Sequence, residues 1–186
     1  MIIAVTGRIG AGKGCAADYF ANKYGFTKYS TGVIARGILQ REGRRGPLPR
    51  FDLQQIGFDY KFELMDGVLQ NISRDGKSDK IVIDCPRYPP QWGQITEFDS
   101  QAYLIAVDAR EELRFERLQS RDGLTGPQSW DEFFAQDGRD WVGYLARNGQ
   151  DVRGCFELAE RTFHNNRTKE EFYAQLDEWL RSVQCS

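Results

Sequence analysis

The sequence predicts an α/β fold in which a five-stranded parallel sheet carries helices on both faces. Short apolar runs typical of buried strands alternate with segments of helical periodicity. The first run leads directly into a glycine-rich loop that opens a helix. The chain of 186 residues, 40% hydrophobic and 28% charged, is long enough for one soluble domain with a full core. We therefore expect a single domain over residues 1–186, with strands at 2–6, 26–29, 80–84, 102–107 and 161–165.

The first expected strand ends at the sequence Gly-Arg-Ile-Gly-Ala-Gly-Lys-Gly-Cys, residues 7–15, which has the spacing Gly-x4-Gly-Lys. Glycines let the backbone fold closely around an anion so that several N–H groups face it, and the following helix adds its positive N-terminal end. Lys13 would bridge the outer phosphates of a nucleotide. The residues expected to hold ATP at this loop are Gly7, Ile9, Gly10, Ala11, Gly12, Lys13, Gly14 and Cys15.

The residues after the loop lysine depart from the general motif, which places Ser or Thr there to hold magnesium. In this chain Gly14 follows the lysine, and Cys15 comes next. A thiol is a poor ligand for Mg2+, which prefers oxygen. Either magnesium is held mostly through water and nucleotide oxygens, or the chain binds a nucleotide without turning it over.

Two stretches interrupt the alternation of strands and helices. Residues 31–74 are expected to hold two helices joined by a basic, Pro- and Gly-rich link, and an apolar stripe indicates that residues 51–74 share one helix face. Residues 122–150 are rich in Gly, Asp and Arg. Insertions at strand ends are where ligand-binding modules lie, so we expect a substrate module at 31–74 and a short lid at 122–150.

The end of the chain is expected to form the last strand and the last helix. Residues 168–171, Thr-Lys-Glu-Glu, form a capping box that should begin this helix. Its apolar residues recur at helical spacing, so one face should be buried.

Charge and composition exclude several classes of function. A net charge of −2 argues against non-specific nucleic-acid binding. No apolar stretch has the length of a membrane span, and the N-terminus lacks a targeting segment. The four cysteines are widely spaced, which predicts a reducing cytoplasm rather than a disulfide framework or a zinc site. His164 is the single histidine, so a multi-histidine zinc centre is excluded.

The Gly-Lys-Gly of the loop resembles the nucleoside monophosphate kinases, and adenylate kinase above all, although Cys15 replaces the threonine of that family. Residues 30–36, Ser-Thr-Gly-Val-Ile-Ala-Arg, look like the family's Ser-Thr-Gly-Asp-x-x-Arg, with Val33 in place of the aspartate. The resemblance implies that Thr31 and Gly32 touch the acceptor base and that Arg36 holds the acceptor phosphate.

Residues 84–91, Asp-Cys-Pro-Arg-Tyr-Pro-Pro-Gln, resemble the family's Asp-Gly-Phe-Pro-Arg-x-x-x-Gln, shortened by one residue. The resemblance implies that Asp84 orients magnesium through water. It also implies that Arg87 contacts phosphates and that Gln91 reads the acceptor base.

Residues 117–121 resemble the arginine pair at the root of the family's lid. Arg117 would pack on the donor adenine, Arg121 would grip phosphates, and Arg139 is the candidate lid arginine. The segment 164–168 resembles the loop that lines the donor base pocket, which assigns Asn165 and Asn166 to ATP binding.

The resemblance as a whole implies the three-layer sandwich of the P-loop kinases and transfer of the γ-phosphate of ATP, with Mg2+, to a nucleoside monophosphate. A phosphate acceptor is already anionic, so transfer needs fixed positive groups rather than a general base. These groups would be Lys13, Arg87, Arg121 and Arg139. The layout also resembles a group of archaeal kinases related to both adenylate kinase and dephospho-CoA kinase.

Other interpretations remain open on the sequence alone. The acceptor could be dephospho-CoA or another small metabolite, and a hydroxyl acceptor would need a base such as Asp84. Alternatively, the chain could be a non-catalytic switch in which ATP binding moves a partner surface.

Overall fold

A computed structural model of the chain describes residues 1–43, 50–76, 79–84, 86–122, 126–142 and 149–184. Parts of the expected link and lid, together with Cys85 and Cys185, lie outside these residues. The described strands form one sheet in the order β2-β3-β1-β4-β5, and each neighbouring pair is parallel. The strands are β1 (Ile2–Gly7), β2 (Thr27–Ser30), β3 (Ile81–Asp84), β4 (Tyr103–Asp108) and β5 (Arg161–His164). The predicted fold class is therefore confirmed, with each strand within one residue of its expected bounds.

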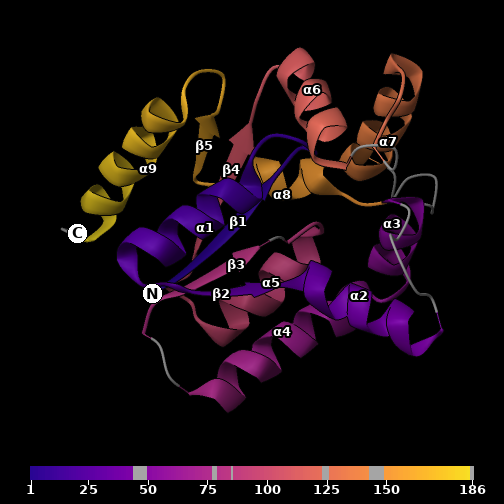
Figure 1. Cartoon of the computed structure of the whole chain (residues 1–186). Coiled ribbons are helices and arrows are strands. Elements are labelled where there is room, and N and C mark those ends of the chain that lie inside the picture. Colours follow the sequence, from indigo (N-terminus) through magenta and orange to yellow (C-terminus); the bar gives the residue numbers. More distant parts are fainter. Residues whose placement is uncertain (44–49, 77–78, 85, 123–125, 143–148, 185–186) are drawn as a thin grey trace.

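Helices cover both faces of the sheet (Figure 1). The helices are α1 (Lys13–Tyr24), α2 (Thr31–Arg41), α3 (Arg50–Asp59), α4 (Lys61–Asp75), α5 (Pro89–Phe98), α6 (Glu111–Asp122), α7 (Trp130–Val142), α8 (Val152–Leu158) and α9 (Lys169–Gln184). Within the described ranges, no helix combines the length and the apolar character needed to cross a bilayer.

Alternate residues of β1 enter two separate hydrophobic cores. Ile3 and Val5 pack with α1 and α9, whereas Ile2 and Ala4 pack with α4 and α5. Because side chains on a strand point to opposite faces in turn, a strand buried on both sides must be apolar throughout. Burial on both faces fixes the central strand and therefore the position of the loop that follows it.

The apolar stripe of residues 51–74 belongs to two helices, not to one, so the expected pair of helices over 31–74 is in fact three. The backbone leaves helical geometry at Tyr60 (φ −113°, ψ 29°), where α4 begins. Ile56 of α3 and Leu64 of α4 both pack against α2, whereas Val68, one turn further along α4, packs against the sheet. The sequence pattern continues through the break because both helices keep their apolar side toward the core.

The expected capping box starts α9. The backbone N–H of Glu171 donates to Thr168 Oγ1 at 3.2 Å, and the N–H of Thr168 donates to Glu171 Oε2 at 3.1 Å. The second bond holds the pKa of Glu171 below its ordinary value. The buried face carries Phe172, Leu176, Trp179 and Leu180, as predicted.

The carboxyl ends of the strands meet at one edge of the sheet, where α2, α3 and α7 gather (Figure 1). Ser30 pairs in register with Asp84, and Val5 pairs with the same aspartate on its other side. In parallel α/β sheets, ligands bind at this edge. The motifs singled out in the sequence therefore converge on one region.

Candidate active site

Three glycines of the loop have positive φ and also approach neighbouring groups closely. The φ angles are 141° at Gly7, 71° at Gly10 and 108° at Gly12. A Cβ at Gly7 would overlap the carbonyl oxygen of Val107, and one at Gly10 would lie 2.5 Å from the carbonyl oxygen of Arg114. These positions need glycine both for conformation and for space, so the loop is fixed against β4 and α6 as well as shaped for an anion.

Lys13 is half-buried at the start of α1, and its Nζ donates to the carbonyl oxygen of Arg8 at 2.8 Å. The bond folds the lysine side chain back over the loop, so that its ammonium lies at the loop and not on a remote surface. Beside it, Cys15 is exposed in the first turn of the same helix. The described loop therefore brings the Lys13 ammonium and the exposed Cys15 thiol to the start of α1.

Arg117 and Asn165 stabilise the glycine-rich loop through hydrogen bonds to its backbone. Asn165 donates from Nδ2 to the carbonyl oxygen of Ala11 at 2.9 Å, and Arg117 donates to that oxygen at 3.4 Å and to the carbonyl of Asn165 at 2.9 Å. Burial lowers the pKa of Arg117. Asn166 instead accepts from the backbone N–H of Arg110 at 2.7 Å. The three residues expected at the donor base thus lie near the loop and the end of β5, where each makes hydrogen bonds to backbone groups.

The helix α7 is fastened to the same loop by a buried ionic cluster. Asp137 accepts a hydrogen bond from Arg8 and, at 2.7 Å, one from Arg114 Nη1. The Arg114 side chain is 1% exposed and that of Asp137 is 3% exposed, so both charges are fully inside the protein. Arg8 also lies over the ring of Trp141, with the guanidinium carbon 4.6 Å from the ring centre.

An apolar contact reinforces this attachment, because Ile9 of the loop packs against Phe133 of α7 and Leu118 of α6. Neither Arg114 nor Asp137 was among the functional residues that the sequence predicted. One signal was present. The spacing of Phe133, Asp137 and Asp140 places two carboxylates on the apolar face of a helix, which requires buried cationic partners.

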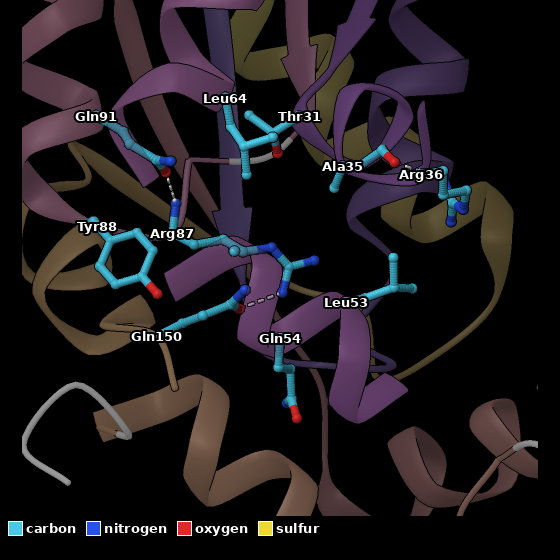
Figure 2. A pocket seen from close by; sticks show the side chains of 12 residues that line it. Thr31, Ala35, Arg36, Leu53, Gln54, Leu64, Arg87, Tyr88, Gln91 and Gln150 are labelled. Carbon is cyan, nitrogen blue, oxygen red and sulfur yellow. Dashed lines mark hydrogen bonds between the residues drawn. The ribbon is translucent and has the colours of Figure 1, made fainter. Parts of the chain in front are cut away.

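A cavity of about 90 Å³ lies between α2, α3, α4 and the segment after β3 (Figure 2). Its apolar walls come from Ala35, Leu53 and Leu64, and its polar walls include three glutamines. The cavity also brings together every residue expected to bind the acceptor: Thr31, Gly32, Arg36, Arg87 and Gln91.

Arg87 is the central cation of this cavity (Figure 2). Its Nη1 donates to Gln150 Oε1 at 2.6 Å and to Asp140 Oδ2 at 3.1 Å. The Asp140 side chain is 2% exposed and also accepts from Gln54 Nε2 at 2.7 Å. Arg87 Nη1 is therefore positioned by two side chains, Asp140 and Gln150, which lie more than fifty residues later in the sequence.

Two further acceptor candidates, Arg36 and Gln91, differ in burial and in hydrogen bonding. Arg36 is exposed, and its Nη1 donates to the carbonyl of Gly32 on its own helix at 3.2 Å. Gln91 is buried, with Nε2 donating to the carbonyl of Lys61 at 2.6 Å and Oε1 accepting from the backbone N–H of Arg87 at 2.7 Å. Gln91 thus fixes the loop that carries Arg87.

Tyr88 closes the inner wall of the cavity. Burial raises the pKa of its phenol, so the hydroxyl stays protonated and donates to the carbonyl of Gly149 at 2.8 Å. The backbone N–H of Asp151 donates to the carbonyl of Arg87 at 3.0 Å. Together these bonds join the segment that precedes α8 to the loop after β3.

The remaining predicted residues lie further from the cavity. Asp84, at the end of β3, forms an ion pair of 3.6 Å with Lys28. Arg121 is exposed in the last turn of α6, and Arg139 is half-buried on α7, with its carbonyl accepting from the N–H of Gln150 at 2.7 Å. None of these three residues lines the cavity.

The parallel sheet in the order 2-3-1-4-5, the glycine-rich loop after β1 and the arginine-bearing cavity beside it define a class of protein. The chain has the fold and the phosphate-binding loop of the adenylate kinase-like P-loop kinases, a class of phosphotransferases.

Comparisons with known proteins agree with this class. No family model matches the chain. A UPF0200 protein of Thermococcus sibiricus is 30% identical over 154 residues, which are 76% of this chain and 75% of that protein. Adenylate kinase isoenzyme 1 of Gallus gallus is 31% identical over 134 residues, which are 67% of this chain and 66% of that enzyme. The shikimate kinase of Aquifex aeolicus has the same fold, with a TM-score of 0.57, 15% identity and coverage of 100% of this chain and 99% of that one. The chain belongs to the UPF0200 family.

Proposed function

We propose that this protein transfers the γ-phosphate of ATP to a nucleoside monophosphate. The observation that carries the proposal is the cavity that collects all five residues expected to bind the acceptor. One turn of α7 joins this cavity to the glycine-rich loop, because Asp140 contacts Arg87 and Asp137 contacts Arg8. Donor and acceptor phosphates bound at the two places would therefore lie close together.

The chemistry of the cavity suits a phosphate acceptor. None of its described lining residues is an aspartate or a glutamate, whereas two of them are arginines. A hydroxyl acceptor needs a general base to take its proton, but a phosphate is already anionic and needs only positive charge and correct placement. The lining therefore supports a nucleoside monophosphate over a hydroxyl-bearing metabolite.

Magnesium would enter this site with ATP and would neutralise charge on the transferred phosphate. Among the described residues, no three His, Cys, Asp or Glu side chains gather to form a metal site of their own. Mg2+ commonly keeps several waters and uses one or two carboxylates together with phosphate oxygens, a pattern that the half-buried Asp84 fits. We expect Asp84 to hold the ion through water.

The activity suits a reducing cytoplasm, where both described cysteines, Cys15 and Cys155, would remain the free thiols that they are in the structure.

An assay of ADP formation tests the proposal. Purified protein is incubated with ATP, Mg2+ and one of AMP, GMP, CMP or UMP, and ADP release is compared with a sample that lacks the acceptor. We expect at least one monophosphate to give turnover far above that background. Tight ATP binding without turnover on any acceptor would instead indicate the non-catalytic switch.

Replacing Arg36 should weaken acceptor binding selectively. Arg36→Ala removes an exposed guanidinium at the cavity, and loss of one charge-assisted contact to phosphate should raise the acceptor KM by about 10- to 100-fold. The Kd for ATP should stay the same. Arg41→Ala is the matched control, because Arg41 makes the equivalent bond to a carbonyl four residues earlier on α2 but does not line the cavity. An unchanged acceptor KM in the Arg36 variant would remove this residue from the site.

Replacing the loop thiol should improve the metal site. Cys15→Thr introduces the oxygen ligand that magnesium prefers, so we expect kcat to rise several-fold and less Mg2+ to be needed for half-maximal rate. Cys15→Val is the matched control because valine has the shape of threonine without its hydroxyl. If both variants gave the same rate, the side chain at this position would have no part in holding the metal.

A further inference from the structure

Gln150 lines the acceptor cavity from a part of the sequence that no motif marked. It is 2% exposed and lies just before α8. Its backbone N–H donates to the carbonyl of Arg139, and its side-chain oxygen accepts from Arg87 at 2.6 Å. The flanking residues are bonded to the loop after β3, so the position of Gln150 relative to the cavity is fixed from both sides.

The contact with Arg87 determines which way the Gln150 amide faces. A guanidinium has donors only, so the amide oxygen must face Arg87 and the NH2 group must face the other way. Figure 2 shows the amide end beside the Arg87 guanidinium. On the other side, a Cβ at Gly57 would come within 2.5 Å of Gln150 Nε2, so this nitrogen lies against the bare backbone of α3.

The Nε2 of Gln150 has no hydrogen-bond acceptor among the residues that the structure describes. A donor at the wall of a cavity that no protein group uses is available to a ligand or to water. The other two glutamines of the cavity differ. Gln91 uses both ends of its amide. Gln54 uses its NH2 group, which donates to Asp140 and to the carbonyl of Gln136, and its buried Oε1, without a partner among the described residues, can only accept. Gln150 therefore has the amide donor that a ligand can use.

We propose that Gln150 is a specificity-determining residue of the acceptor cavity. Its Nε2–H donates to a hydrogen-bond acceptor, a ring nitrogen or a carbonyl oxygen, on the base of the nucleoside monophosphate. Arg87 orients this amide and faces the phosphate of the same molecule. The inference rests on the proposed function, and it replaces Gln91 as the amide that reads the base.

Truncation of the ligand separates reading of the base from placement of Arg87. The Kd of the tightest-binding monophosphate among AMP, GMP, CMP and UMP is measured by calorimetry, together with that of ribose 5-phosphate, which lacks a base. Gln150→Met keeps the length of the side chain but removes the amide. We expect this variant to bind the nucleotide about tenfold more weakly and to bind ribose 5-phosphate as the wild type does.

A second variant, Gly57→Ala, tests the same contact in case Gln150→Met fails to fold. Gly57→Ala adds one methyl group where Gln150 Nε2 lies, and alanine favours the helix that contains it, so the protein should stay folded. It should weaken nucleotide binding in the same selective way. Gln55→Met, on the same helix but outside the cavity lining, is the control and should leave both Kd values unchanged.

The outcomes are distinct. An equal loss for nucleotide and ribose 5-phosphate would mean that Gln150 only positions Arg87, which overturns the inference. Unchanged nucleotide binding in both variants would overturn it as well. If the wild type neither binds nor phosphorylates any of the four monophosphates, the proposed function itself fails, and the inference fails with it.

Discussion

Lys13→Met should reduce phosphoryl transfer by about 10²–10³-fold in kcat, the effect typical of removing one preorganised group that stabilises transition-state charge. The lysine lies at the glycine-rich loop, where its ammonium already bonds to the carbonyl of Arg8. In a P-loop this ammonium meets the outer phosphates, and negative charge spreads over the transferred group as the bond breaks. Steady-state rates with saturating ATP and acceptor measure the change.

Lys23→Met is the matched control for this prediction. Lys23 lies in the last turn of the same helix, and its ion pair with Asp177 is at the protein surface. Its loss should leave kcat unchanged, and thermal melting should show both variants folded. A Lys13 variant that kept most of its activity would show that the loop does not hold the reacting phosphates in the proposed way.

The fold could be predicted in detail because the three central strands, β1, β3 and β4, are buried on both faces. Runs such as residues 80–84 must then be apolar almost throughout, and helices must lie on either side. The break at Tyr60 could not be predicted, because the apolar stripe from Leu53 to Ile72 keeps its spacing across it. Ile56 of α3 and Leu64 of α4 pack in the same cluster on either side of the break, and no residue type marks the break itself.

That the acceptor candidates line one cavity follows from the topology, which brings their motifs together. Ser30 and Asp84 are in register on neighbouring parallel strands, so the residues that follow each strand start side by side. What holds Arg87 could not be found in the same way. Its partners Asp140 and Gln150 come from α7 and from the segment before α8, which no sequence spacing connects to β3.

Asp137→Asn should lower the free energy of unfolding by about 3 kcal/mol, because breaking a buried ion pair leaves the remaining charge uncompensated. Arg114 is the critical partner, since its side chain is 1% exposed and cannot turn to solvent without moving α6. For a chain of this size the melting temperature should fall by about 6–12 °C. Urea unfolding followed by circular dichroism measures the change.

Asp131→Asn, in the exposed first turn of the same helix, is the control and should cost about 0.5 kcal/mol. A second test uses the partner. If the pair is the cause, Asp137→Leu combined with Arg114→Met should destabilise the protein less than the sum of the two single changes, because the fully buried guanidinium is removed with its carboxylate and Arg8, 24% exposed, can still reach solvent. Strictly additive effects would contradict the ionic attachment of α7 to the loop. If α7 also aligns the two phosphate sites, the Asp137→Asn variant should lose kcat even at temperatures where it is fully folded.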